Sequence, residues 1–283
     1  SRRQRQMCIR DRDNVFYGRK WVKEVVKTIQ TKDVLQATYF KRYLLRAMMA
    51  GFIISIISVF VLAIKAGFVQ EVHTGEINTG IINIVGSVAF SFALVLILFT
   101  NSELLTSNFM YFTVGLYYKV ISPWRAFQIF MLCFIGNMLG ALVFFIILRF
   151  SDVVTPEMMK QLEVILHHKT LTASPTELLA KAIFANFFIN ISLVIAMQIE
   201  DILAKMFVMM FGVAIFAFMG YEHVVYNACL FIGGAIYQSD VLHFWPAVIN
   251  IVAAFIGNYI GGGLIIGLFY AYLNDHKQFK DEL

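Results

Sequence analysis

Long apolar stretches alternate with short polar links along most of the chain. Six apolar runs can be distinguished, at about residues 43–68, 81–118, 124–149, 178–197, 202–236 and 245–273. About 20 apolar residues in a helix are needed to cross the hydrocarbon core of a bilayer, and only helices and closed barrels can span it. Runs of this length favour helices, so we expect an all-α integral membrane protein with six transmembrane helices.

Composition agrees with this pattern and excludes an ordinary soluble domain. Hydrophobic residues make up 59% of the 283 positions, charged residues make up only 14%, and the mean hydropathy is +0.73. Soluble domains are typically about 45–50% apolar and about 25% charged. The cysteines Cys8, Cys133 and Cys229 are too widely spaced to suggest a disulfide framework or a metal site. We therefore expect no cofactor and no metal.

Positive charge is concentrated at the amino-terminal end. Residues 1–46 contain 13 of the 23 Lys and Arg residues. A basic flank beside a first membrane span marks the cytoplasmic side, and it explains the net charge of +5 without nucleic-acid binding. Six crossings then place both termini in the cytoplasm. The sequence thus predicts a multi-pass protein of the inner (cytoplasmic) membrane.

The chain is expected to divide into a membrane domain, residues 43–275, and three flanking segments. Residues 15–42 carry apolar positions at helical spacing with Lys and Arg between them. This predicts an amphipathic helix along the cytoplasmic face, with Trp21 as its interfacial anchor. Residues 1–14 show no apolar period and are expected to be a disordered or artificial tail, and residues 276–283 a cytoplasmic tail.

Two polar breaks interrupt apolar runs at matching positions. The sequence NSELLTSN interrupts the second run and MGYEHVVYN the fifth; Glu103 and Glu222 lie 119 positions apart, as do Asn108 and Asn227. An ionisable residue at the bilayer centre costs roughly 2.5–3.5 kcal/mol and needs a partner or a water-filled cavity. No proline lies within either break, so neither is a proline kink. Matched breaks in two halves of a chain indicate the binding site of a transporter.

The two halves of the chain also share a short repeat. The sequence FIGN occurs at residues 134–137 and again at 255–258, 121 positions later. With three crossings in each half, at about residues 43–150 and 176–275, the second half must be inverted relative to the first. We therefore expect an inverted 3+3 repeat in which the second and fifth helices are broken.

Four motifs occur in the order NSELLTSN, FANFFIN, GYEHVVYN and FIGNYIGGG, and in them the chain resembles the formate/nitrite transporter family over about residues 15–275. The resemblance implies a homopentamer in which each protomer has an aquaporin-like six-helix fold and its own pore. Aquaporins themselves fit less well, because no Asn-Pro-Ala box is present. It also implies a channel or transporter for small monovalent anions of weak acids, of the formate or nitrite class.

Carried over to this chain, the resemblance implies three groups of site residues. The pore group comprises His223 at the centre, Thr106 facing it, Asn186 beside it and Lys169 in the outer vestibule. The inner constriction is assigned to Leu94 and Phe216, and the outer one to Phe90, Leu105 and Ile189. The residues that brace the breaks are Glu103, Glu222, Asn108 and Asn227. Structural alternatives stay open: Asn186 can bridge helices, Phe90 and Phe216 can be packing residues, and His223 can be a structural histidine.

Small anions of weak acids suit such a pore. An apolar constriction on either side of one histidine excludes hydrated ions, but a neutral acid passes at a much lower desolvation cost. The expected mechanism is pH-gated or proton-coupled through His223, since an unperturbed histidine pKa of about 6.5 lies in the physiological range. Hydrosulfide, or lactate and acetate, are alternative substrates of the same fold.

Two other classes of function remain as alternatives. An intramembrane enzyme would use Glu222 and His223 as acid and base, but no nucleophile or metal set accompanies the pair. A scaffolding membrane protein would leave the matched breaks without an explanation. We therefore expect a transporter and not an enzyme, with formate, nitrite or a similar anion and the lipid bilayer as its partners.

Overall fold

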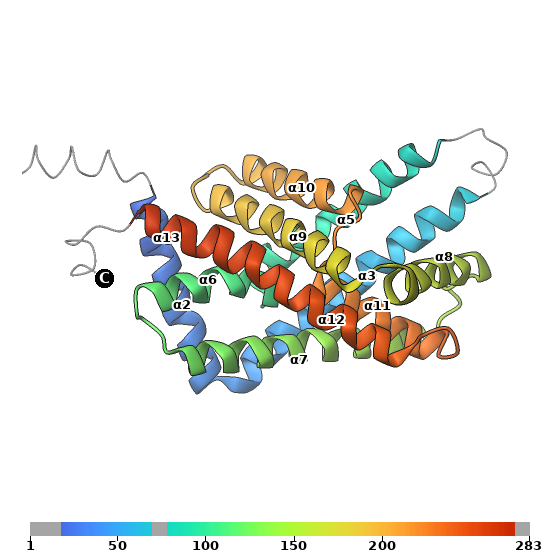
Figure 1. Cartoon of the computed structure of the whole chain (residues 1–283), viewed down its shortest axis with the longest axis horizontal. Coiled ribbons are helices and arrows are strands. Elements are labelled where there is room, and N and C mark those ends of the chain that lie inside the picture. Colours follow the sequence, from blue (N-terminus) through green and yellow to red (C-terminus); the bar gives the residue numbers. More distant parts are fainter. Residues whose placement is uncertain (1–17, 70–77, 275–283) are drawn as a thin grey trace, which may run out of the picture.

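The computed structural model describes residues 18–69 and 78–274, and every regular element within these ranges is a helix (Figure 1). The elements are α2 (Arg19–Thr38), α3 (Phe40–Gly67), α5 (Thr79–Phe99), α6 (Leu105–Tyr117), α7 (Pro123–Leu148), α8 (Pro156–His167), η1 (His168–Thr172), α9 (Pro175–Ala196), α10 (Ile202–Phe218), α11 (Val224–Tyr237), α12 (Phe244–Asn258), η2 (Tyr259–Leu268) and α13 (Phe269–Leu273). The predicted tails, 1–14 and 276–283, lie outside the described residues.

Within the described ranges, five helices are long and apolar enough to cross a membrane. They are α3, α5, α7, α9 and the continuous run of α12, η2 and α13 from Phe244 to Leu273. Two shorter apolar helices, α10 and α11, follow one another in the chain. Large apolar side chains cover the outside of the bundle, as a lipid environment requires. The prediction of an all-α, multi-pass membrane protein is thus confirmed.

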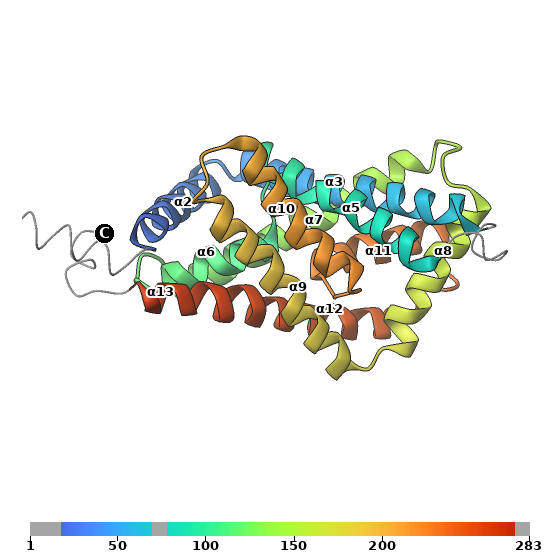
Figure 2. The ribbon, with the colours of Figure 1, turned by 90° about the horizontal axis from the view of Figure 1, so that it is seen from above.

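The helices run along the long axis of the molecule, and the run from α12 to α13 extends over most of its length (Figures 1 and 2). The helix α2 lies across one end of the bundle, beside α6 and α13, and α8 lies at the opposite end. The short helices α6 and α11 lie between these ends. The two ends of the bundle are therefore covered by elements that do not cross it.

The helix α2 packs against the bundle through one apolar stripe. Val22, Val25, Val26 and Ile29 are buried, at spacings that place them on one face. Trp21, expected to be an interfacial anchor, is instead 2% exposed and makes an edge-to-face contact with Tyr270 at 6.1 Å. That expectation was wrong because the sequence pattern does not reveal that α13 covers this position.

The polar connection between the third and fourth apolar runs contains a helix that the sequence analysis did not predict. Thr155 caps α8, since its hydroxyl accepts the Met158 N–H at 3.3 Å, and Pro156 occupies the first turn, where its missing N–H costs nothing. Met158, Leu162 and Leu166 follow at i, i+4 and i+8 and are buried. The high polarity of the segment conceals this narrow apolar stripe.

Glycines allow two pairs of helices to approach closely at matching places. A Cβ atom at Gly140 of α7 would lie 1.8 Å from the Met48 carbonyl oxygen of α3. A Cβ atom at Gly261 of η2 would lie 2.0 Å from the Ile183 carbonyl oxygen of α9. Gly140 and Gly261 are 121 positions apart, the offset of the FIGN repeat. Small residues at such contacts let helix backbones pack in a membrane.

Candidate functional site

Each of the two polar breaks separates a pair of apolar helices. The first lies between Phe99, where α5 ends, and Leu105, where α6 begins. The second lies between Phe218, where α10 ends, and Val224, where α11 begins. Both breaks fall at the positions expected from the sequence.

Both breaks begin with a residue in the left-handed backbone region. Asn101 has φ 51° and Gly220, 119 positions later, has φ 65°. In each case the next N–H reaches back to the carbonyl five residues earlier, from Ser102 at 3.0 Å and from Tyr221 at 3.1 Å. Gly and Asn are the residues that adopt this helix-ending conformation at least cost. The repeat therefore includes the backbone conformation with which α5 and α10 end.

Glu103 braces the first break from within the protein. Its carboxylate forms an ion pair with Lys32 of α2, and Asn108 Nδ2 donates to it at 3.4 Å. The Glu103 and Lys32 side chains are only 5% and 13% exposed. A buried carboxylate needs such compensation. The role of Lys32 was missed, because in the sequence it is one basic residue among many in the amphipathic segment.

Glu222 occupies the equivalent position in the second break. Lys169 Nζ donates to its carboxylate at 2.6 Å, and so does Asn227 Nδ2, also at 2.6 Å. The Lys169 ammonium group also lies over the Tyr226 ring, 5.5 Å from its centroid. The resemblance assigned Lys169 to the outer vestibule; in the structure it lines a cavity, and its charge is paired with Glu222.

Asn137 ties the first break to the neighbouring helices. Its Oδ1 accepts the Leu105 N–H at 3.2 Å, and its Nδ2 donates to the carbonyl oxygens of Ala47 and Glu103, both at 2.8 Å. The side chain is completely buried. It thus satisfies an N–H at the start of α6 and a carbonyl of the break, which have no partner within a helix.

Asn258 makes the same three hydrogen bonds at the second break. Its Oδ1 accepts the Val224 N–H at 2.8 Å, and its Nδ2 donates to Ala182 O at 2.7 Å and Glu222 O at 2.9 Å. Asn137 and Asn258 are the asparagines of the two FIGN repeats. In the sequence they indicated only a repeat, although a shared polar residue within an apolar run was the signal for this role.

Thr106 and His223 meet where the two short helices begin. His223 Nε2 lies 2.9 Å from Thr106 Oγ1, and His223 Nδ1 accepts the Tyr226 N–H at 3.0 Å. Because Nδ1 is an acceptor, the neutral ring carries its proton on Nε2 and donates it to Thr106 Oγ1. The Thr106 hydroxyl hydrogen then remains available for another acceptor. The pair predicted from the sequence is therefore in direct contact.

Two asparagines of α9 hold the backbone of Thr106. Asn186 Nδ2 donates to Thr106 O at 3.1 Å and to Asn258 O at 2.7 Å. Asn190 Nδ2 donates to Thr106 O at 3.2 Å and to Asn186 Oδ1 at 2.8 Å. Asn186 thus lies beside the pair, as expected, and it also bridges helices. Asn190, one helical turn later in the motif FANFFIN, was missed.

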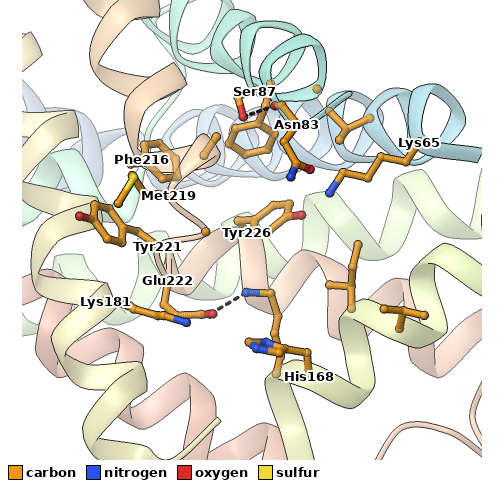
Figure 3. Close-up of a pocket in the computed structure, with 18 residues that line it drawn as sticks. Lys65, Asn83, Ser87, His168, Lys181, Phe216, Met219, Tyr221, Glu222 and Tyr226 are labelled. Carbon is orange, nitrogen blue, oxygen red and sulfur yellow. Dashed lines mark hydrogen bonds and ion pairs between the residues drawn. The ribbon is translucent and has the colours of Figure 1, made fainter. Parts of the chain in front are cut away.

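Two cavities lie on opposite sides of this pair. We call the one beside α8 the outer cavity, after the orientation expected from the sequence. It has a volume of about 450 Å³, and its lining includes Phe90, Lys169 and Phe216, the last of which is labelled in Figure 3. The one beside α2, the inner cavity, has a volume of about 380 Å³, and Leu94 is among its lining residues. His223 and Thr106 line neither cavity. Both side chains are buried, whereas the neighbouring Ser107 lines the inner cavity and Glu222 lines the outer one.

The predicted constriction residues are divided between these cavities. Phe90 and Phe216 contact each other edge to face at 5.9 Å at the outer cavity, and Phe216 stacks on His223 at 6.1 Å. Phe216 thus lines the outer cavity, whereas the resemblance assigned it to the inner constriction beside Leu94. Leu105 and Ile189 are buried but line neither of the two cavities.

Side chains that could bind a metal ion are dispersed in the part of the chain that the structure describes. No group of three or more His, Cys, Asp or Glu side chains there is arranged to hold a metal ion. Cys133 and Cys229 are buried free thiols. What the arrangement offers is one hydroxyl and one imidazole between apolar rings.

Sequence comparison relates the chain to known membrane transporters. Residues 19–272 match the family described as formate/nitrite transporter. The formate channel FocA of Escherichia coli (strain K12) is 27% identical over 275 residues, which cover 87% of this chain and 90% of that protein. The uncharacterized transporter YwcJ of Bacillus subtilis (strain 168) is 28% identical over 190 residues, covering 66% of this chain and 74% of the relative.

Solved structures of the same fold are also known. A protein described as an FNT family ion channel matches with a TM-score of 0.80 and 22% identity, over 89% of this chain and 97% of that chain. A pentameric formate channel with formate bound matches with a TM-score of 0.68 and 21% identity, over 84% of this chain and 98% of that chain. These similarities show the overall fold of the chain.

Proposed function

The chain belongs to the formate/nitrite transporter family, and we propose that it forms a channel for small monovalent anions of weak acids, of the formate or nitrite class. The observation that carries this proposal is the Thr106–His223 pair, buried between an outer and an inner cavity. The E. coli relative named above is a formate channel. Its similarity covers most of both chains, which supports the same class of substrate here.

The proposed path follows the two breaks. Six crossings are formed by α3, α5 with α6, α7, α9, α10 with α11, and the run from α12 to α13, and the two halves are inverted copies. An anion enters the outer cavity, passes Phe90 and Phe216, meets His223 and Thr106, and leaves past Leu94 into the inner cavity. The matched hydrogen bonds of Asn137 and Asn258 support the inverted repeat.

Charge complementarity favours an anion at the centre of this path. The helices α6 and α11 both begin there, at Leu105 and Val224, and the amino-terminal end of a helix carries a partial positive charge. Broken helices that present such ends to a central site are the arrangement expected for anionic substrates. Glu103 and Glu222 do not oppose this, because Lys32 and Lys169 neutralise them.

The apolar rings decide the form in which the substrate crosses. A hydrated anion loses its water between Phe90 and Phe216, and the desolvation cost is far smaller for the neutral acid. We infer that the substrate takes up a proton on entering this layer. His223, in the tautomer inferred from its hydrogen bonds, then acts as a fixed hydrogen-bond donor with Thr106. Transport is thus coupled to protons through the weak acid itself, which carries the proton while the central histidine binds it.

The assembly and placement follow from the same relationship. A structure of the same fold is described as a pentameric formate channel, and we propose a homopentamer with one pore in each protomer. We place the protein in the inner membrane with both termini in the cytoplasm, because α2, which carries part of the basic charge near the amino terminus, lies at one end of the bundle. Lipid contacts the exposed apolar faces.

Uptake of labelled formate by proteoliposomes tests the proposal. Vesicles containing the protein should take up formate faster than empty vesicles, and faster as the external pH falls, since more of the acid is then protonated. Nitrite, hydrosulfide and lactate measured at two pH values identify the preferred anion. Uptake equal to that of empty vesicles for all four anions, with the folded oligomer present, would contradict the proposed function.

A further inference from the structure

Positive side chains outnumber negative ones in the lining of the outer cavity. Its ionisable lining residues are Lys65, His168, Lys169, Lys181 and Glu222 (Figure 3). Lys169 is paired with Glu222 at 2.6 Å, and Lys181 with Glu177 at 2.5 Å. Within residues 18–69 and 78–274, Lys65 has no ion-pair or hydrogen-bond partner. Among the described residues, its ammonium group is therefore the lysine charge of this cavity that no carboxylate neutralises.

Two further polar groups point toward the Lys65 ammonium. Figure 3 shows the side chains of Lys65 from α3, Asn83 from α5 and Tyr226 from α11 directed toward one another across the cavity. Neither the Asn83 amide nor the Tyr226 hydroxyl has a hydrogen-bond partner in the described part of the chain. An ammonium, an amide and a phenol together offer several donors and one positive charge.

We propose that Lys65, Asn83 and Tyr226 form an outer capture site for a small monovalent anion such as formate. The inference rests on the proposed channel function and adds the place where the substrate is held before it loses its water. A carboxylate has two oxygens that accept hydrogen bonds, and charge-assisted bonds from an ammonium are the stronger kind. Lys169 fixes Glu222 and the second break, and Lys65 attracts the anion.

Tyr226 connects this capture site with the centre of the protein. Its ring lies 5.0 Å from that of Phe90, and its backbone N–H donates to His223 Nδ1 at 3.0 Å. The rings of Phe90 and Phe216 thus separate an anion beside the Tyr226 hydroxyl from the Thr106–His223 pair. The capture site lies where a partly hydrated anion gathers before passing Phe90 and Phe216.

Formate uptake kinetics in right-side-out vesicles test the site. In water, two unit charges 4 Å apart attract each other by an energy that corresponds to about a fivefold change in affinity. We expect Lys65→Gln to raise the KM for external formate by about fivefold with little change in maximal flux, and Lys65→Arg to restore the KM. Tyr226→Phe and Asn83→Ala, which each remove one hydrogen bond, should raise the KM by about threefold.

Lys160→Gln is the matched control, because Lys160 is exposed on α8 and does not line the cavity. It removes the same charge from the same end of the protein and should leave the KM unchanged. If wild-type vesicles carry no formate, the proposed function itself fails. If they carry formate and Lys65→Gln keeps the wild-type KM, or shifts it only as much as Lys160→Gln does, the capture site is wrong and the channel function stands.

Discussion

At His223, a single backbone hydrogen bond limits the protonation of the imidazole ring. The Tyr226 N–H occupies Nδ1, so a doubly protonated ring would direct one N–H at another unless it first turned away. We predict that His223→Asn, whose side chain can cap α11 and still donate, conducts formate with the wild-type dependence on pH between about pH 5 and 7. Flux measured across that range checks this, and a flattened profile would show that the ring titrates.

His223→Phe should behave differently, because it removes the central donor. The substrate then has no polar partner beside Thr106 in a dry layer, and an unsatisfied buried polar group costs about 1–3 kcal/mol. Since about 1.4 kcal/mol corresponds to a factor of ten, formate flux should fall at least about tenfold. Equal flux in wild type and His223→Phe, with the oligomer intact, would assign His223 a structural role.

Phe216 should control the size of the substrate. It is 3% exposed and lies between Phe90 and His223, with ring centroids 5.9 and 6.1 Å away. We predict that Phe216→Ala increases lactate flux relative to formate flux, because the opening beside His223 widens. Leu203→Ala on the same helix is the control, since Leu203 is 75% exposed and lines neither the outer nor the inner cavity. An unchanged ratio would make Phe216 a packing residue.

The sequence identified the central residues better than their contacts. Glu103, Glu222 and His223 could be singled out in the sequence, because ionisable residues within apolar runs are costly in a membrane and indicate a functional site. The pairing of Glu103 with Lys32 was not, because 71 positions separate them and many other lysines were candidates. The tautomer of His223 depends on a backbone N–H three residues later, and only the local geometry of the break reveals it.

At the scale of elements, the helix crossings at Gly140 and Gly261 are the most sensitive contacts. A Cβ there would lie 1.8 and 2.0 Å from backbone oxygens, so the paired helices must move apart. We predict that Gly140→Ala and Gly261→Ala each destabilise the protein by about 1–3 kcal/mol, the usual cost of overpacking. Thermal unfolding in detergent measures this. Gly67→Ala, with nothing within 4 Å, should be silent, and equal effects at all three positions would contradict the close crossings.

The starts of helices could be predicted from the sequence where a capping residue and a proline precede the apolar run. Pro123 and Pro175 begin α7 and α9, and the preceding Ser122 and Ser174 cap them, so these helices start close to where hydrophobicity begins. The helix α8 was missed because its apolar side chains are few and its surroundings are charged. The identical roles of Asn137 and Asn258 were missed because a repeat indicates equivalence without indicating what the equivalent residues bind.

At the scale of the whole molecule, the hydrophobic pattern predicted a multi-pass helical protein, and the repeat offset relates the two halves. What the pattern could not reveal is how the flanking segments cover the ends of the bundle. The helix α2 supplies Lys32 to one break and η1 supplies Lys169 to the other. Both elements lie outside the apolar runs, so their place depends on tertiary contacts that hydropathy does not record.

Apolar surface at α5 and α10 is where we expect protomers to meet. Phe207 and Phe211 of α10 are 69% and 62% exposed, and Ile84 and Val88 of α5 lie beside a shallow apolar cavity of about 230 Å³. Lipid and a second protomer both suit such a face, since lipid tails are as apolar as these side chains. The pentameric formate channel of the same fold favours protomers. We predict that native mass spectrometry in mild detergent finds five chains of 32.3 kDa in one particle. A predominance of monomers would contradict the proposed homopentamer.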